Sequence, residues 1–596
     1  MPSAISQRWC QLVRRRSRAR RVLLCIALCL PLPAAAVSLQ VNVEGVEGQE
    51  RKNVLALLAI YQEQGKKNLT VPLLLALHRR APEQIRNALA PFGLYRVQVQ
   101  DSLKQPEQGN DRWVATYRID PGQPVKIASV DYQITGAGAD NPAFPKKFPM
   151  QPGDVLLHAD YDKAKNEITA IASEQGYLDA DLVRHVVLID PVAYDAHIEF
   201  HLETGPRFYF GHVTFKQDLL SDAYLKKFVD FKPGDVYDPD LLLQLQGNLV
   251  AMEYYKNVEI VPLMDQAGPD HQVPIRVVAE RNKPNKYLVG VGYATDIGPR
   301  FSLDYRRRYI GPRGHKLKAE IQVAPVTQSL VADYRIPFRN PLSDYYVIRP
   351  ELYSYDTASR QGTQFKVGAA QSILTRSGWR RDIGVDYRYE DYKITDEPNN
   401  TFNGLVPYVA WSRVDADDPI NTKNGYRVRF LVQGTARNVL SETSFLSGTA
   451  SVKWIKTLGA RNRFITRADL GATWAPSLQD VPASQRFFAG GDSSIRGWGL
   501  DALGPIDPAT GQVVGGRFLA VGSLEYDRTI KGPWGVAVFT DFGNAFDPTY
   551  NSAWEQSVGG GLRFATPIGP IRVDLAYAIT KDPAGFRLHL GLGPDL

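Results

Sequence analysis

The sequence has almost no cysteine. Its only cysteines are Cys10, Cys25 and Cys29, all within the first 36 residues. The rest of the chain therefore cannot form a disulfide, a thiolate metal site or a cysteine nucleophile. If the first 36 residues are removed, stability must come from packing or from a lipid bilayer.

The sequence also lacks long apolar runs and an excess of one charge. No segment after residue 36 has about 18 consecutive apolar residues, so no spanning helix is expected, and a membrane location would require a β-barrel. The formal net charge is +7, but the first 36 residues contain seven arginines and no acid, which leaves the remainder at 0. The sequence pI of about 9.0 is therefore due to the arginines of this leader. Because the remainder carries no excess of positive charge, we predict no nucleic-acid partner.

The leader has the three parts of a secretory signal peptide. Basic residues fill Arg14 to Arg21, an apolar run follows from Val22 to Leu32, and Ala34-Ala35-Ala36 provides small residues for cleavage. We predict a signal peptide over 1–36 and an exported protein. An uncleaved amphipathic helix is the alternative.

Helix and strand patterns then recur with a period near 80 residues. Gly93 and Gly176, which each open a strand, are 83 residues apart, and Gly153 and Gly234, in two Pro-Gly-Asp-Val turns, are 81 apart. This spacing predicts tandem copies of one α/β module. The expected modules span 37–121, 122–204 and 205–283. Their main helices are expected at 52–63, 82–91, 161–175 and 240–252.

From residue 284 to 596 the helical period disappears and strand-like alternation takes its place. Phe430 and Val432 lie on one face of such a segment, with Arg429 and Gln433 opposite. About sixteen such segments, and seven of the nine tryptophans, lie in this region. A soluble sandwich would alternate similarly, but the tryptophans and the uninterrupted β pattern favour a membrane barrel. The predicted fold class is α+β repeats followed by a sixteen-stranded antiparallel transmembrane β-barrel.

One glycine-rich loop, 487–499, is the strongest candidate site. We predict that it folds back into the barrel and that Arg496 holds it there, because a buried guanidinium needs an acidic partner. Asp541 is the expected bidentate partner. Glu525, on a neighbouring segment, is a competing acid.

Closing a barrel requires its first and last strands to meet. These are expected at Lys286 to Ala294 and at Phe586 to Leu592. Glycine weakens strands, although it could equally fit a crowded lumen. A weak lateral seam is therefore predicted at Gly290, Gly292, Leu590 and Gly591.

Other candidate sites carry little weight. His197-x-Glu199-x-His201 places three potential metal ligands on one strand face, but a solvated face of an amphipathic strand accounts for them. Gly491-Asp492-Ser493 lacks the strand–elbow–helix context of a hydrolase serine. We predict no catalytic residue, no metal and no cofactor.

Several motifs together resemble the BamA/TamA superfamily of outer-membrane assembly factors. Ile495-Arg496-Gly497-Trp498 is similar to the family's loop-six motif, and Phe539-x-Asp541-x-Gly543 is similar to its barrel-strand motif. The run 561–574 resembles its late strands, and the α/β modules resemble its POTRA domains. Two features depart from the pattern: Trp498 stands where Phe or Tyr is usual, and Pro594 follows the last strand.

The resemblance implies an outer-membrane protein of a Gram-negative bacterium, with three POTRA domains in the periplasm. It implies a barrel that helps outer-membrane or autotransporter-type client proteins to assemble within the lipid bilayer. Likeness to the TamA branch implies a TamB-like, inner-membrane-anchored periplasmic partner. An outer-membrane port of a lipid-transport bridge is an alternative that shares every residue. A two-partner-type secretion pore is a further alternative, although such pores typically have two POTRA domains and a plug helix.

Overall fold

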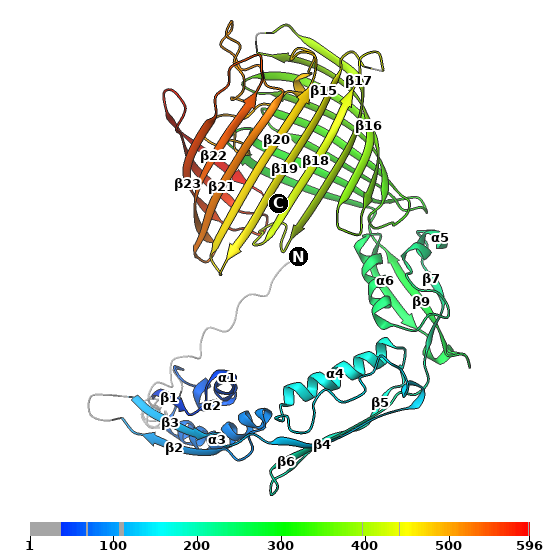
Figure 1. Cartoon of the computed structure of the whole chain (residues 1–596), viewed down its shortest axis with the longest axis vertical. Coiled ribbons are helices and arrows are strands. Elements are labelled where there is room, and N and C mark those ends of the chain that lie inside the picture. Colours follow the sequence, from blue (N-terminus) through cyan, green and yellow to red (C-terminus); the bar gives the residue numbers. More distant parts are fainter. Residues whose placement is uncertain are drawn as a thin grey trace, which may run out of the picture. The chain divides into compact units, whose positions relative to one another are not determined.

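The computed structural model describes residues 37–66, 69–106, 112–395, 397–439, 441–593 and 595. The predicted signal peptide lies outside these residues. The chain forms two compact units (Figure 1). The first consists chiefly of residues before Phe210, and the second combines most of the third repeat with the barrel.

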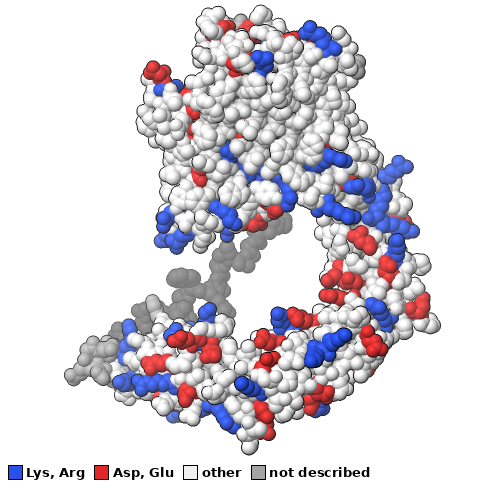
Figure 2. All heavy atoms as spheres, viewed as in Figure 1, with Lys and Arg blue, Asp and Glu red and all other residues white. Residues whose placement is uncertain are grey.

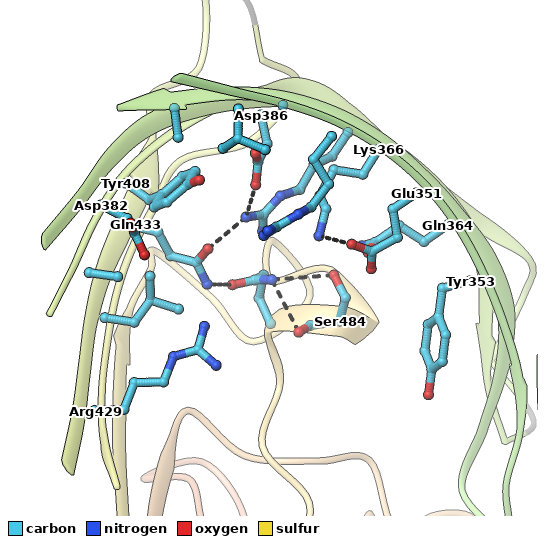
Figure 3. A pocket seen from close by; sticks show the side chains of 18 of the residues that line it. Glu351, Tyr353, Gln364, Lys366, Asp382, Asp386, Tyr408, Arg429, Gln433 and Ser484 are labelled. Carbon is cyan, nitrogen blue, oxygen red and sulfur yellow. Dashed lines mark hydrogen bonds and ion pairs between the residues drawn. The ribbon is translucent and has the colours of Figure 1, made fainter. Parts of the chain in front are cut away.

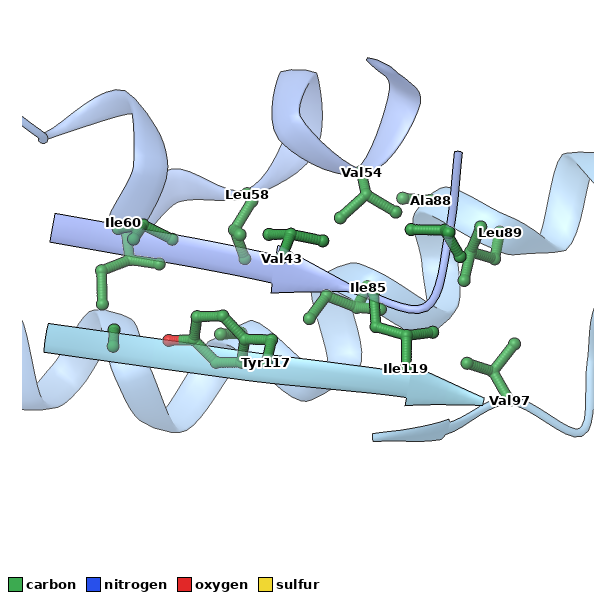
Figure 4. Close-up of a cluster of buried hydrophobic side chains, with 14 of the residues drawn as sticks. Val43, Val54, Leu58, Ile60, Ile85, Ala88, Leu89, Val97, Tyr117 and Ile119 are labelled. Carbon is green, nitrogen blue, oxygen red and sulfur yellow. The ribbon is translucent and has the colours of Figure 1, made fainter. Parts of the chain in front are cut away.

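The first repeat packs helices on one face of a three-stranded sheet. Its strand order is β1-β3-β2, with β1 parallel and β2 antiparallel to β3. Leu58, Ile85 and Tyr117 are buried between the helices and the sheet (Figure 4). The elements are β1 (Ser38–Glu44), α1 (Gly48–Leu57), α2 (Ala59–Gln62), α3 (Val71–Leu89), β2 (Gln98–Lys104) and β3 (Arg112–Asp120).

Helix α3 corrects one prediction. The sequence pattern placed its start at Pro82, but α3 begins at Val71 and contains Pro82. A proline inside a helix costs about 3 kcal/mol. Burial of Leu74, Ile85 and Leu89 contributes roughly 1.5–3 kcal/mol for each side chain, which more than offsets that cost.

The second and third repeats have the same strand arrangement as the first, with orders β4-β6-β5 and β7-β9-β8. The domain boundaries expected from the sequence, after residues 121, 204 and 283, stay predictions. The second repeat contains β4 (Lys126–Thr135), α4 (His158–Glu174), β5 (Asp181–Asp190) and β6 (Asp195–Glu203). The third contains β7 (Tyr209–Lys216), α5 (Asp222–Leu225), α6 (Pro239–Ala251), β8 (Tyr255–Pro262) and β9 (Gln272–Arg281).

The rest of the described chain forms one sheet of sixteen strands, β10 to β25, each antiparallel to its chain neighbour. This confirms the predicted strand number and class. The strands are β10 (Asn285–Ala294), β11 (Gly298–Ile310), β12 (His315–Val323), β13 (Thr327–Pro337), β14 (Tyr345–Asp356), β15 (Arg360–Leu374), β16 (Arg380–Ile394), β17 (Asn400–Ala416), β18 (Gly425–Thr435), β19 (Phe445–Leu458), β20 (Asn462–Trp474), β21 (Phe518–Lys531), β22 (Trp534–Phe546), β23 (Glu555–Phe564), β24 (Ile571–Ala578) and β25 (Gly585–Leu592).

The barrel is apolar outside and polar inside. On β16, Ile383 and Val385 are exposed on the outer wall, whereas Asp386 and Arg388 are buried toward the lumen. Figure 2 shows that the central band of the visible barrel wall is mostly uncharged. Exposed tryptophans lie near both ends of the strands, as in an interfacial girdle: Trp411, Trp454, Trp474, Trp534 and Trp554. No helix in the described part of the chain is both long and apolar enough to cross a bilayer.

The third repeat contacts one end of the barrel. Ser221 N–H donates to the Pro312 carbonyl (3.0 Å), and the Tyr254 hydroxyl donates to the Gly314 carbonyl (2.6 Å). Gly314 has φ +66°, and a Cβ there would lie 2.8 Å from the Tyr224 ring. Because β10 begins at this end and strands alternate in direction, the turns after β11, β13 and β15 all lie at the repeat side of the barrel.

Candidate functional site: a loop held inside the barrel

The loop between β20 and β21, residues 475–517, folds into the barrel. Ile495 and Trp498 are buried with Val521 of β21 and Ala578 of β24. On another part of the wall, Arg360 of β15 donates to the Asp501 carboxylate (2.9 Å). The loop therefore contacts strands that are far apart around the sheet.

Gly497 lets the loop approach the wall closely. Its φ is +103°, and a Cβ at this position would lie 3.2 Å from the Ala578 Cβ. A side chain at this position would be strained by both the backbone angle and the lack of space. The predicted motif residues Ile495, Arg496, Gly497 and Trp498 are thus all held against the barrel interior.

Arg496 and Asp541 lie together, and their contact is bidentate. Arg496 Nε donates to Asp541 Oδ2 (2.7 Å) and Nη2 donates to Oδ1 (2.9 Å). The Arg496 backbone N–H also donates to Oδ2 (3.0 Å). Asp541 is fully buried and Arg496 is 6% exposed. Such paired, charge-assisted hydrogen bonds are among the strong ones in proteins.

Two further carboxylates bind the same guanidinium. Arg496 Nη1 donates to Glu525 (2.8 Å) and to Asp574 of β24 (3.0 Å). The sequence analysis treated Glu525 as a competitor of Asp541, whereas both bind Arg496 at once, through different nitrogens.

Two more arginines balance these acids. Arg563 of β23 donates to Glu525 (2.6 Å) and pairs with Asp574. Arg467 of β20 donates to the Ser493 and Ser494 carbonyls of the loop. We name the whole group the Arg496 cluster: Arg467, Arg496, Arg563, Glu525, Asp541 and Asp574. Asp527 also lies 3.6 Å from Arg563, and Asp469 lies 3.7 Å from Arg467, so every guanidinium of the cluster has an acidic neighbour.

The other two residues of the β22 motif also have geometric roles. The Phe539 ring lies under Arg496, with the guanidinium carbon 3.4 Å from the ring centroid, which is a cation–π contact. Gly543 has φ +136°, and a Cβ there would lie 2.1 Å from the Ala520 carbonyl oxygen. Phe539, Asp541 and Gly543 therefore support the loop by stacking, by ion pairing and by close strand packing.

The seam between β10 and β25 is short. The described residues form no ladder between these strands, and β10 and β25 stand at opposite ends of the sheet order. Thr295, just past β10, donates its N–H to the Leu590 carbonyl (3.3 Å), and Leu590 N–H donates to the Thr295 hydroxyl (2.7 Å). Arg587 adds a side-chain contact to Asp296 (3.5 Å).

The predicted seam residues take different positions. Leu590 makes the backbone contact just described. Gly290 and Gly292 lie on β10 opposite Ser302 and Arg300 of β11. A Cβ at Gly591 would meet no atom within 4 Å, so steric crowding does not require glycine there.

The loop itself bridges both edges of the seam. Asp492 N–H donates to the Asp296 carboxylate beyond β10, and the Asp492 carboxylate pairs with His589 Nδ1 on β25. His589 Nε2 accepts the Gly497 N–H (2.9 Å). Since Nε2 accepts this bond, a neutral ring carries its proton on Nδ1 and donates it to Asp492.

The same three side chains are the candidate metal ligands among the described residues: Asp296, Asp492 and His589. A metal on His589 Nδ1 would move the ring proton to Nε2, where it would face the Gly497 N–H. The geometry therefore fits a hydrogen-bonded latch better than a metal site.

The remaining sequence candidates have separate partners. His197 contacts Ser129, Glu199 pairs with Arg184, and His201 contacts Asp131. The sequence analysis missed Asp296, His589 and the pairing role of Arg563. Arg563 and Asp574 stand in the run 561–574 that resembles the family, so that signal could have found them. Nothing local in the sequence marks His589, which is 97 positions from Asp492.

Three α/β repeats, a sixteen-stranded barrel and a lumenal loop held by an arginine define a class: outer-membrane barrels with POTRA domains. Comparison with known families gives the same result. Residues 283–595 match the Omp85 superfamily domain. Residues 40–121 match the POTRA domain described as TamA domain 1, and residues 208–280 match the POTRA family described as surface antigen variable number repeat. The chain belongs to the Omp85 superfamily, which confirms the resemblance at that level.

Named relatives are outer-membrane protein assembly factors BamA. The one from Nitratidesulfovibrio vulgaris is 24% identical over 59% of this chain and 45% of its own length. The one from Neisseria meningitidis serogroup B is 20% identical over 75% of this chain and 64% of its own length. The chain thus spans about half to two thirds of these relatives.

A solved structure shares the fold. BamA from Haemophilus ducreyi lacking POTRA domains 1–3 superposes with a TM-score of 0.68 at 16% identity, covering 79% of this chain and 99% of that one. The protein is located in the outer membrane of a Gram-negative bacterium, with its POTRA domains in the periplasm. The repeat side of the barrel is therefore its periplasmic end.

Proposed function

We propose that this protein promotes the insertion and assembly of outer-membrane or autotransporter-type proteins through its lateral seam. The observation that carries this proposal is the seam itself, which the described residues close at the turn after β10 instead of with a strand ladder. Each such hydrogen bond contributes only about 0.5–1.5 kcal/mol net. The strand contacts of the seam would therefore open at low free-energy cost, and the loop contacts of Asp492 must break with them.

An open seam would offer β10 as a template. A client strand could pair with its edge by β-augmentation, and main-chain hydrogen bonds would provide the affinity. The side chains of β10 suit a strand at a lipid boundary, because Tyr287, Val289 and Val291 are 65%, 67% and 79% exposed. The client's own folding would supply the driving force, so the proposal requires no catalytic residue and no cofactor.

The POTRA domains would bind a TamB-like, inner-membrane-anchored periplasmic protein. The match of residues 40–121 to a TamA-type POTRA domain supports this partner. Three repeats with one topology argue against a two-partner secretion pore, which typically has two. A port for lipid transport would use the same barrel and remains the competing function.

A disulfide across the seam tests the proposal, because the chain after residue 36 has no cysteine. Thr295→Cys with Leu590→Cys should form a bond, since these backbones already contact each other. We expect client assembly in reconstituted membranes to stop when this bond forms and to resume after reduction.

The matched control is Ile383→Cys with Val409→Cys, which joins β16 to β17 within the ladder and involves neither β10 nor the seam. It should leave client assembly unchanged in both redox states. Normal assembly with the 295–590 bond formed would exclude lateral opening and favour the lipid port.

A further inference from the structure

A cavity lies at the periplasmic rim of the barrel, away from the loop and the seam. It sits between the β13–β14 turn, residues 338–344, and the β15–β16 turn, residues 375–379, and has a volume of about 630 Å³. We name it the rim pocket. Its lining combines three arginines with an apolar floor: Arg339, Arg376, Arg381, Ile373 and Leu374.

The rim pocket has an excess of positive charge. Its one carboxylate, Asp344, is buried and already accepts from Arg339 Nε (2.8 Å), the Ser343 hydroxyl (3.0 Å) and the Leu374 N–H (3.2 Å). Arg376 and Arg381 have no hydrogen-bond or ion-pair partner within the described ranges. Two guanidinium groups are therefore available to an anionic ligand.

Two cations of the barrel lumen differ in this respect. Figure 3 shows the lumenal pocket, in which Lys366 lies against Glu351. Arg388 donates to Asp386 (2.8 Å) and Gln433 (2.8 Å), and Lys366 pairs with Glu351 (2.5 Å). Arg388 and Lys366 are thus compensated by their neighbours, whereas Arg376 and Arg381 of the rim pocket are not.

The position of Arg381 indicates what kind of anion fits. On β16 it has the same side-chain direction as Ile383 and Val385, which face lipid, because residues two apart share a strand face. Its ladder neighbours are Ile373 of β15 and Trp411 of β17. The guanidinium therefore lies where the apolar wall meets the periplasmic water.

We propose that the rim pocket binds the phosphate diester headgroup of an anionic phospholipid from the periplasmic leaflet. Arg376 and Arg381 would donate to the phosphate oxygens, as arginine does in planar, bidentate recognition of phosphate. Ile373, which lies on the same face as Arg381, would contact the first carbons of the acyl chains. A free phosphate would satisfy the arginines but would leave this apolar floor in water.

Native mass spectrometry of the purified full chain tests the proposal, with phosphatidylglycerol titrated into the detergent-solubilised protein. Each guanidinium near a membrane surface contributes about fivefold in affinity for an anionic lipid. Arg376→Gln combined with Arg381→Gln should therefore weaken the tightest phosphatidylglycerol adduct by about 25-fold.

The control is Arg461→Gln, which removes an exposed arginine from the β19–β20 turn at the same end of the barrel. It should bind phosphatidylglycerol like the unaltered protein. Equal binding by the double variant would overturn the proposal. Displacement of the lipid by an equal concentration of glycerol phosphate or inorganic phosphate would assign the pocket to a free anion and would also overturn it.

Discussion

At the scale of single residues, Arg496 contributes more than one ion pair. It binds three carboxylates, stacks on Phe539 and uses its backbone N–H as well. Removing one member of a buried ion pair costs about 3–5 kcal/mol, because the remaining charges lose compensation. The loop should therefore depend strongly on this side chain.

Arg496→Ala should release the loop while the barrel still inserts. We expect faster proteolysis within residues 475–517 and reduced client assembly, with unchanged heat-modifiable migration of the barrel on gels. Asp541→Asn should have a smaller effect, since Glu525 and Asp574 still hold the guanidinium. The double variant should be little worse than Arg496→Ala, because the two residues act together.

Arg437→Ala is the control for that experiment. Arg437 also reaches the loop, through Asp480 (2.9 Å), but its side chain is 58% exposed. Exposed ion pairs contribute about 0–1 kcal/mol to stability. The proteolysis pattern of Arg437→Ala should therefore match that of the unaltered protein. Equal protection of the loop in Arg496→Ala would show that the cluster does not hold it.

At the scale of elements, the seam depends on the loop as well as on β10 and β25. Asp492 contacts both edges of the seam. His589 of β25 also accepts the N–H of Gly497, the loop residue that follows Arg496. Opening the seam must therefore break loop contacts in addition to strand contacts.

His589→Leu should loosen the seam without disturbing the Arg496 cluster. It leaves the Asp492 carboxylate and the buried Gly497 N–H without this partner, and the loss at Gly497 costs about 1–3 kcal/mol. Spin labels at positions 295 and 590 should report a broader and longer distance distribution. His212→Leu, an exposed histidine on β7, should not change it. A distribution in His589→Leu identical to that of the unaltered protein would mean that strand contacts alone hold the seam.

The sequence predicted the strand class and the motif residues, but not these cross-seam contacts. Arg496 and Asp541 could be matched because each lies in a recognisable pattern and a buried guanidinium demands an acid. Asp296, Asp492 and His589 come together only when the sheet curves into a barrel, so no local periodicity marks them. Helix α3 was underestimated because Pro82 is a local break signal, whereas tertiary burial decided the outcome.

At the scale of the whole molecule, charge joins the third POTRA domain to the barrel. Glu253, which follows α6, pairs with Lys286 of β10 (3.0 Å) and Arg308 of β11 (3.3 Å). The hydrogen bond from Lys286 holds the pKa of the Glu253 carboxyl below its usual value, and the charge of Arg308 adds to this. This contact complements the backbone bonds to the β11–β12 turn.

The sign of the pH effect follows from that lowered pKa. A carboxylate with a depressed folded-state pKa stabilises the contact above the ordinary glutamate pKa of about 4.3 and loses its contribution as pH falls through the lowered value. Glu253→Gln should therefore speed hydrogen exchange of the Ser221 amide at pH 7. Acidification below about pH 4 should reduce the difference in Ser221 exchange rate between the Glu253→Gln variant and the unaltered protein.

Glu280→Gln is the matched control at this scale. Glu280 pairs with Lys256 on the surface of the third repeat, and among the described residues its side chain has no hydrogen bond or ion pair to the barrel. In the Glu280→Gln variant, the Ser221 amide should exchange at the same rate as in the unaltered protein, both at pH 7 and below about pH 4. Equal exchange in Glu253→Gln at pH 7 would show that the backbone bonds suffice for the junction.

The buried ion pairs of the Arg496 cluster restrict how this protein can evolve. Arg496 and Arg563 are buried against Asp541 and Asp574, so a single change of charge there leaves an uncompensated group. Viable descendants should alter these positions in matched pairs or not at all. Trp498 packs against apolar neighbours instead, so another aromatic residue could replace it without a compensating change. Related sequences should therefore differ at this position of the motif more often than at Arg496.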